Sequence, residues 1–195
     1  MALLRAPFAP PAAKGGQRYW LPLHLIRYLH TTPEQTDGEE IMPSKQQEQI
    51  QALINDLNED LAREYQAIIA YTVYSNVLKG AQWMNIAGEL KLHAAQELQH
   101  ALIIADQIDY LGGMPTVVPK PVKTSEKPED MIRFDLDNET ETISNYRKRV
   151  RQAEAVGHFA LAEQLRTIVS QEQEHQHDLA TALGIDVPNV LPDGA

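Results

Sequence analysis

Residues 170–177 read SQEQEHQH and contain two overlapping copies of Glu-x-x-His, one from Glu172 to His175 and one from Glu174 to His177. Residues three apart lie on one face of an α-helix, so either pair could hold a metal ion. Either pair could equally belong to the solvated face of a polar helix. The register of the surrounding apolar residues distinguishes these two interpretations.

The composition of the 195-residue chain limits the possible functions. There is no cysteine, which excludes disulfides, zinc ribbons, rubredoxin-type iron sites and iron–sulfur clusters. A net charge of −10 argues against non-specific nucleic-acid binding. No run of apolar residues is long enough to span a membrane, and we expect a cytoplasmic protein. Any metal site must therefore use carboxylate and imidazole ligands.

The first 41 residues differ in composition from the rest. Before Glu34 they contain no acidic residue, but they contain basic and aromatic residues and several prolines. This composition is compatible with an organellar transit peptide, a basic disordered arm or untranslated sequence. We favour the last, because Gly38–Glu40 would be encoded by purine-rich codons just before Met42, where a bacterial ribosome-binding sequence would lie. We expect residues 1–41 to be a disordered or untranslated extension, and residues 42–195 to be one domain.

From Ser44 onward, apolar residues recur with the 3.6-residue period of a helix. An N-cap, glycines and prolines divide this pattern into four helices, over residues 44–79, 81–110, 128–156 and 158–183. The links between the first two and the last two helices are short, so each pair forms an antiparallel hairpin. The domain is therefore predicted to be all-α.

The segment 113–128 connects the two hairpins and contains four prolines, which favour an extended strap over a helix. Sixteen extended residues reach roughly 50 Å at about 3.3 Å per residue, and a 30-residue helix is about 45 Å long. The strap can therefore cross the whole bundle and make the second and third helices parallel. The predicted fold is a ferritin-like four-helix bundle with one long crossover between helices two and three.

Each predicted helix carries a glutamate near the middle of its apolar stripe, and two helices add a histidine three residues later. A misread stripe, with a solvated side chain, is the alternative for any one glutamate. The equal spacing of 33 residues between the glutamates of each hairpin favours a common site. The residues concerned are Glu64, Glu97, His100, Glu139, Glu172 and His175.

Four unpaired carboxylates in an apolar core would be strongly destabilising or protonated, whereas two divalent ions would balance their charge. Carboxylate and imidazole suit iron(II) or manganese(II), so we predict a centre with two iron ions per subunit, with manganese as an alternative. Glu172 and His175 lie on the apolar stripe, whereas Glu174 and His177 are rotated away from it. We expect the second pair to face solvent.

The segments Arg63–Tyr65, Gln96–Ala101, Asp135–Glu139 and Gln171–His175 resemble those of the bacterioferritins, and the resemblance covers roughly residues 57–183. It implies a ferroxidase with two bridging and two terminal glutamates. By this resemblance the bridging residues would be Glu97 and Glu172, the terminal ones Glu64 and Glu139, and the remaining ligands His100 and His175.

Two further residues near the predicted centre have alternative interpretations. Tyr71 stands where the family has a tyrosine beside the site that can supply an electron, which implies a catalytic role; a core tyrosine is the alternative. His93 lies one turn before Glu97. We interpret His93 as a packed core histidine, with a supporting group near the metals or an iron-entry ligand as alternatives.

The chain departs from the family pattern in two places. Leu98 replaces the methionine that binds haem between subunits, so we predict no haem by that route. After Gly184 only a short segment with two prolines remains, where the family has a fifth helix that helps to build a 24-subunit shell. A homo-oligomer is expected, but its size is left open.

The sequence thus predicts oxidation of Fe(II) by O2 or hydrogen peroxide, for iron storage or detoxification. One alternative is a peroxide-reducing di-iron protein of the rubrerythrin type, although the chain lacks the cysteines of a rubredoxin domain. Another is a DNA-protecting ferritin-like bundle, which the basic N-terminal residues would support.

Overall fold

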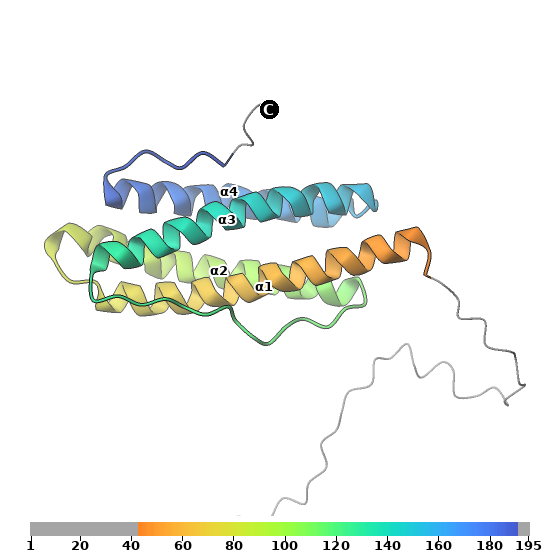
Figure 1. The fold of residues 1–195 in the computed structure, drawn as a ribbon, viewed down its shortest axis with the longest axis horizontal. Helices are drawn as coiled ribbons and strands as arrows, with labels where there is room; N and C mark the ends of the chain where they lie inside the picture. Colours follow the sequence, from red (N-terminus) through yellow and green to blue (C-terminus); the bar gives the residue numbers. More distant parts are fainter. Residues whose placement is uncertain (1–42, 191–195) are drawn as a thin grey trace, which may run out of the picture. The chain divides into compact units, whose positions relative to one another are not determined.

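The computed structural model describes residues 43–190, which form four long helices and one short 3-10 helix (Figure 1). In chain order these are α1 (Lys45–Val77), η2 (Ala81–Trp83), α2 (Met84–Tyr110), α3 (Pro128–Ala155) and α4 (Phe159–Leu183). These residues contain no strand, so the all-α prediction is confirmed. The predictions for residues 1–41 lie outside the described residues.

Local sequence signals set the helix ends. The Ser44 side chain accepts a hydrogen bond from the backbone of Gln47, whose side chain in turn accepts one from the backbone of Ser44; this is a capping box. Pro128 occupies the first turn of α3, where its missing N–H costs nothing. Gly184 ends α4 with a φ of 67°, in the left-handed region that favours glycine.

The strap of residues 111–127 follows α1 along its length and joins the far end of α2 to the start of α3 (Figure 1). Its backbone is bound by α1 at successive positions, for example by Lys120 N–H to Ala62 O at 2.9 Å and Gln66 Nε2 to Pro121 O at 2.6 Å. Helices α2 and α3 are therefore parallel, and the predicted long crossover is confirmed.

The strap leaves α2 at Gly113, where backbone and side chains pack too closely for a larger residue. A Cβ atom there would lie 2.6 Å from Ile54 Cγ2 and 3.0 Å from Ile108 Cγ2. Glycine therefore lets the turn close directly against both hairpin helices.

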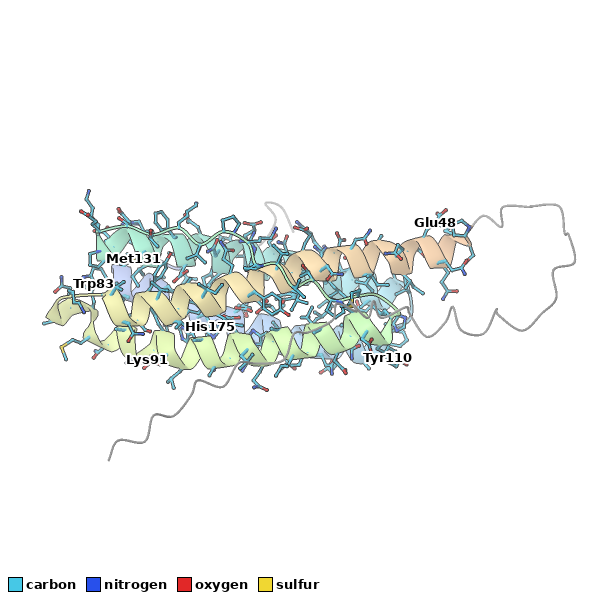
Figure 2. The ribbon with its side chains drawn as sticks, turned by 90° about the horizontal axis from the view of Figure 1, so that it is seen from below. Glu48, Trp83, Lys91, Tyr110, Met131 and His175 are labelled. Carbon is cyan, nitrogen blue, oxygen red and sulfur yellow. The ribbon has the colours of Figure 1, made fainter. Side chains whose placement is uncertain are left out.

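Helix α1 packs against α2 and α3, and α4 packs against α3 and α2. The apolar core has two parts. One part includes Leu57, Ile104 and Leu165, and the other includes Tyr74, Leu90 and Leu179. His175 lies near mid-length of the bundle, away from the ends marked by Trp83 and Tyr110 (Figure 2). Polar side chains thus occupy the middle of the bundle, between two apolar ends.

After α4 the described chain forms no fifth helix up to residue 190. It runs back beside α3 and α4, where Arg147 Nη1 donates to Val190 O at 2.5 Å and Gln176 Nε2 donates to Pro188 O at 3.4 Å. None of the helices in residues 43–190 has the length and hydropathy needed to cross a membrane.

Candidate metal centre

The structure brings all six predicted ligand residues together in the buried middle of the bundle. They form two groups of four, and within each group one ligand atom per residue lies within 4.8 Å of the others. The two groups share Glu97 and Glu172, the residues predicted to bridge. The first group is completed by Glu64 and His100, and the second by Glu139 and His175.

Both histidines direct Nδ1 toward the carboxylates. His100 Nδ1 lies 3.1 Å from Glu97 Oε2, and His175 Nδ1 lies 2.9 Å from Glu97 Oε1. On the other side of each ring, Nε2 lies 2.8 Å from an amide oxygen, Gln171 Oε1 for His100 and Gln96 Oε1 for His175. When Nε2 donates its proton to that oxygen, the neutral ring offers the Nδ1 lone pair to a metal.

Two buried tyrosines hold the terminal glutamates. Tyr71 donates its hydroxyl hydrogen to Glu139, and Tyr146 donates to Glu64. Burial raises the pKa of both hydroxyls well above the usual range, and the neighbouring carboxylates raise it further. The sequence placed Tyr146 on a core stripe without a role at the centre. Its position seven residues after Glu139, like that of Tyr71 after Glu64, is the signal that could have revealed it.

The carboxylates fit divalent cations because the described protein supplies too little positive charge. One buried oxygen each of Glu64, Glu97 and Glu172 lacks a well-aligned hydrogen bond, and its charged neighbour is Nδ1 of His100 or His175. All four glutamates border a cavity of about 10 Å³, close to the minimum space for one small bound species. A set of carboxylate and imidazole donors around such a space suits iron or manganese.

The pKa shifts of the glutamates also favour a site for divalent cations. Burial raises the pKa of Glu97 and Glu139 well above the usual range. The pKa of Glu172 is lowered, because hydrogen bonds from His100 and His175 outweigh the effect of burial. Without metal, protons therefore have to neutralise part of the charge that two divalent ions would balance.

The two sides of the centre differ in chemistry. On the α1–α3 side, Arg63 lines the cavity; its Nη2 lies 2.7 Å from Glu141 Oε1 and its Nη1 donates to Asn138 Oδ1 at 3.2 Å. A guanidinium held in an ion pair thus occupies this seam, the α1–α3 seam, and offers no ligand atom to a cation.

On the opposite side, between α2 and α4, His93 packs directly on the centre. Its ring stacks on that of His175 with centroids 4.1 Å apart and meets Tyr71 edge-on at 5.5 Å. Its Nε2 lies 3.3 Å from Asp178 Oδ2. Burial, with the nearby His175, lowers the pKa of His93 to about 4. The histidine is buried as predicted, but it also carries a polar contact to the next helix that the sequence did not reveal.

Glu174 and His177 are exposed, as predicted for the second of the overlapping pairs. Leu98, directly after Glu97, is also exposed and has no metal-binding atom.

Residues 54–186 match the family model of the ferritin-like domain. The chain belongs to the ferritin-like family. Among its curated relatives is a bacterioferritin of Desulfovibrio desulfuricans, 30% identical over 124 residues, which are 63% of this chain and 69% of the relative. The chain is thus a bacterioferritin-type ferritin-like protein.

Solved structures of family members agree with this assignment. A ferritin-like di-iron-carboxylate protein of Bacillus anthracis is 33% identical with a TM-score of 0.68, covering 73% of this chain and 99% of that one. The bacterioferritin structure of Desulfovibrio desulfuricans, described with its di-iron site in different catalytic states, is 26% identical with a TM-score of 0.66, over 73% of this chain and 84% of that one. The six clustered residues fit a di-iron site of this family.

Proposed function

We propose that this protein is a ferroxidase that oxidises Fe(II) to Fe(III) for iron storage or detoxification. The observation that supports it is the pair of buried four-residue groups that share Glu97 and Glu172 and whose glutamates have no lysine or arginine partner among the described residues. In this proposal Glu64 and Glu139 are terminal ligands and the two histidines complete the sites. The same donors would also accept manganese.

The substrate chemistry requires two electrons from two Fe(II) ions, which a molecule of O2 accepts together with two protons to give hydrogen peroxide. The residues of the chain position the substrate and balance its charge. Four glutamates offset the positive charge of two ions, and the amide oxygens of Gln96 and Gln171 hold the histidine protons on Nε2, which leaves Nδ1 to face the ions. Reduction of that peroxide to two water molecules takes two more electrons and two protons; we assign one of these electrons to Tyr71, hydrogen-bonded to Glu139, and the other to a further Fe(II) ion.

A homo-oligomer is part of the proposal, because the α1–α2 hairpin exposes several large apolar side chains. Ile69 and Val73 on α1, and Leu98 and Leu102 on α2, expose between 37% and 57% of their surface. Burying such side chains between subunits is favourable. A bacterioferritin-related protein of Bacteroides fragilis, 26% identical with a TM-score of 0.62 over 69% of this chain and 86% of that one, is described as dodecameric.

The proposal can be tested by adding Fe(II) to the metal-free protein under anaerobic conditions and then admitting oxygen. Binding is followed by calorimetry, oxidation by absorbance and particle size by light scattering. We expect two Fe(II) bound at the centre of each chain, rapid oxidation and further uptake of iron into an assembly. Two ions bound with no further uptake would contradict storage and favour a peroxidase of the rubrerythrin type. No binding would exclude the metal centre.

A further inference from the structure

A third group of possible ligands lies at the seam between α2 and α4, outside the six-residue centre. It consists of Glu89, His93 and Asp178, with one ligand atom from each residue within 4.8 Å of the others. Glu89 is exposed, His93 is buried and Asp178 is half-buried, so the group leads from solvent to the interior. Asp178 also lines a surface hollow of about 470 Å³.

His93 makes this group more than a pair of surface acids. The residue is only 3% exposed, and its Nδ1 has no hydrogen-bond partner in the described chain, while Nε2 faces Asp178 at 3.3 Å. Nε2, the nitrogen that faces Asp178, is therefore the atom placed to bind an ion at this seam. An imidazole combined with two carboxylates is a donor set for a divalent cation.

The corresponding position in the other half of the bundle lacks these donors. Residues 75 positions apart in the sequence occupy equivalent places in the two hairpins, as Arg63 and Asn138 show by facing each other. Advancing His93 by this spacing gives Ile168, and moving Asp178 back by it gives Ile103. Both isoleucines belong to the apolar core. Glu89 advanced by the same spacing gives Gln164, so the other end of the α2–α4 seam has two isoleucines and an amide in place of the imidazole and the carboxylates.

The α1–α3 seam offers no comparable approach for a cation. There Arg63 lines the cavity and is fixed by Glu141 and Asn138. At the α2–α4 seam, in contrast, the outer groups are carboxylates and the inner one stacks on His175. The charge of the two seams favours entry of a cation between α2 and α4.

We propose that Glu89, His93 and Asp178 bind a divalent cation, such as Fe(II), Mn(II) or Zn(II), at a site separate from the di-iron centre. The site lies one imidazole ring away from His175, which places it where a cation would wait before entering the centre. This staging role rests on the proposed ferroxidase function, whereas binding at the site does not.

Binding is tested with Zn(II) alone on the full chain, because Zn(II) is redox-inert and accepts imidazole and carboxylate ligands. We expect about three Zn(II) per chain in equilibrium dialysis, and an anomalous diffraction peak between the three residues in crystals soaked with Zn(II). The isosteric variants Asp178→Asn and Glu89→Gln should each lose one ion and this peak, and both changes lie where they leave the core intact. Glu174→Gln, which changes an acid bordering the same hollow, should keep both.

The two proposals fail in different ways. Glu97→Ala should lose the two central ions and keep the peak at the seam. A wild-type protein with central peaks but none at the seam, or an Asp178→Asn variant with an unchanged seam peak, would overturn the third site while leaving the di-iron centre. A seam peak without central peaks would overturn the centre alone.

The staging role is tested separately, by the initial rate of Fe(II) oxidation. With Asp178→Asn, the initial rate of Fe(II) oxidation should fall at low Fe(II) and recover at saturating Fe(II), as for a defect in delivery. Glu174→Gln should follow the wild-type curve at all concentrations. An Asp178→Asn variant that loses its seam ion but oxidises Fe(II) like the wild type at low concentration would contradict staging.

Discussion

The two hairpins, α1–α2 and α3–α4, carry the same ligand residues and partners at a spacing of 75. Each hairpin supplies the hydrogen-bond partners for the ligands of the other. Tyr71 of the first hairpin binds Glu139 of the second, and Tyr146 of the second binds Glu64 of the first. The histidine partners Gln96 and Gln171 cross over in the same way. Neither hairpin can orient its own ligands, so the centre exists only where the two pack together.

The hairpins differ in the contacts of a buried aspartate that lies one turn before the terminal glutamate. Asp60 meets Arg149, whose Nε lies 2.7 Å from its Oδ2. Asp135 is 2% exposed, and its Oδ2 has no partner in the described chain. The residue equivalent to Arg149 in the first hairpin is Tyr74, which carries no charge and donates instead to the strap at Lys123 O. The metal-ligand residues are thus repeated in the two hairpins, but the residues that contact the buried aspartate are not.

The largest expected effect comes from the shared glutamates. Glu97→Ala and Glu172→Ala should each abolish binding of both central ions, because each residue belongs to both groups of four. Iron content after anaerobic loading measures this directly, with exposed Glu174→Ala as the control. If one variant lost both ions and its counterpart kept one, the two hairpins would not be equivalent at the centre.

The next largest effect should come from Arg149→Met. Removing the cation leaves Asp60 buried and unpaired, which costs about 3 kcal/mol of unfolding free energy. Burial already raises the pKa of Asp60 to about 7 despite Arg149. Urea unfolding measures the loss. The control is Arg133→Met, which breaks an exposed ion pair with Glu129 and should cost about 0–1 kcal/mol. If both variants lost the same unfolding free energy, the buried ion pair would contribute no more to stability than the exposed one.

A smaller effect should separate the two tyrosines. Tyr71→Phe and Tyr146→Phe each remove one hydrogen bond to a terminal glutamate. Each change should weaken metal binding by about 1 kcal/mol. Metal affinity should therefore fall similarly in both variants. Oxidation of bound Fe(II), followed by stopped-flow absorbance, should slow further in Tyr71→Phe alone if that residue supplies an electron. Equal slowing in both variants would remove the special role of Tyr71.

The smallest effect concerns pH and Asp135. Burial raises the pKa of this carboxyl well above its usual value of about 3.9, so the folded state holds a proton that the unfolded chain has released. Its contribution to stability is therefore present at low pH and is lost as the pH rises through the folded pKa. Asp135→Asn should flatten the fall in melting temperature of the metal-free protein between about pH 5 and 8. Exposed Asp137→Asn should leave the slope unchanged.

Most of the fold could be predicted because its signals are local. Ser44, Pro128 and Gly184 end helices through their own backbone chemistry, and the prolines of the strap exclude a helix wherever the rest of the chain lies. Two boundaries differed clearly from the prediction. Helix α1 ends at Val77 rather than at residue 79, and Leu78 packs into the core. Residues 81–83, predicted to begin the second helix, form the 3-10 helix η2, so that α2 begins at Met84.

The candidate centre could be predicted where helix periodicity alone places a side chain inward. Glu97 and His100 lie on one stripe, so their convergence needs no knowledge of other helices. The partners that come from a different helix were missed. Asp178 reaches His93, and Gln96 reaches His175, only because α2 and α4 pack at a particular axial offset, which no single-helix pattern contains.

The strap has a consequence for how the protein takes up metal. Side chains of Asn58, Gln66 and Tyr74 bind its backbone along α1, so the strap is anchored at several points as well as at its ends. Such a tether fixes the axial register of one hairpin against the other before any ion arrives. The ligands are therefore preorganised, and an incoming ion needs to displace protons without also having to order the chain.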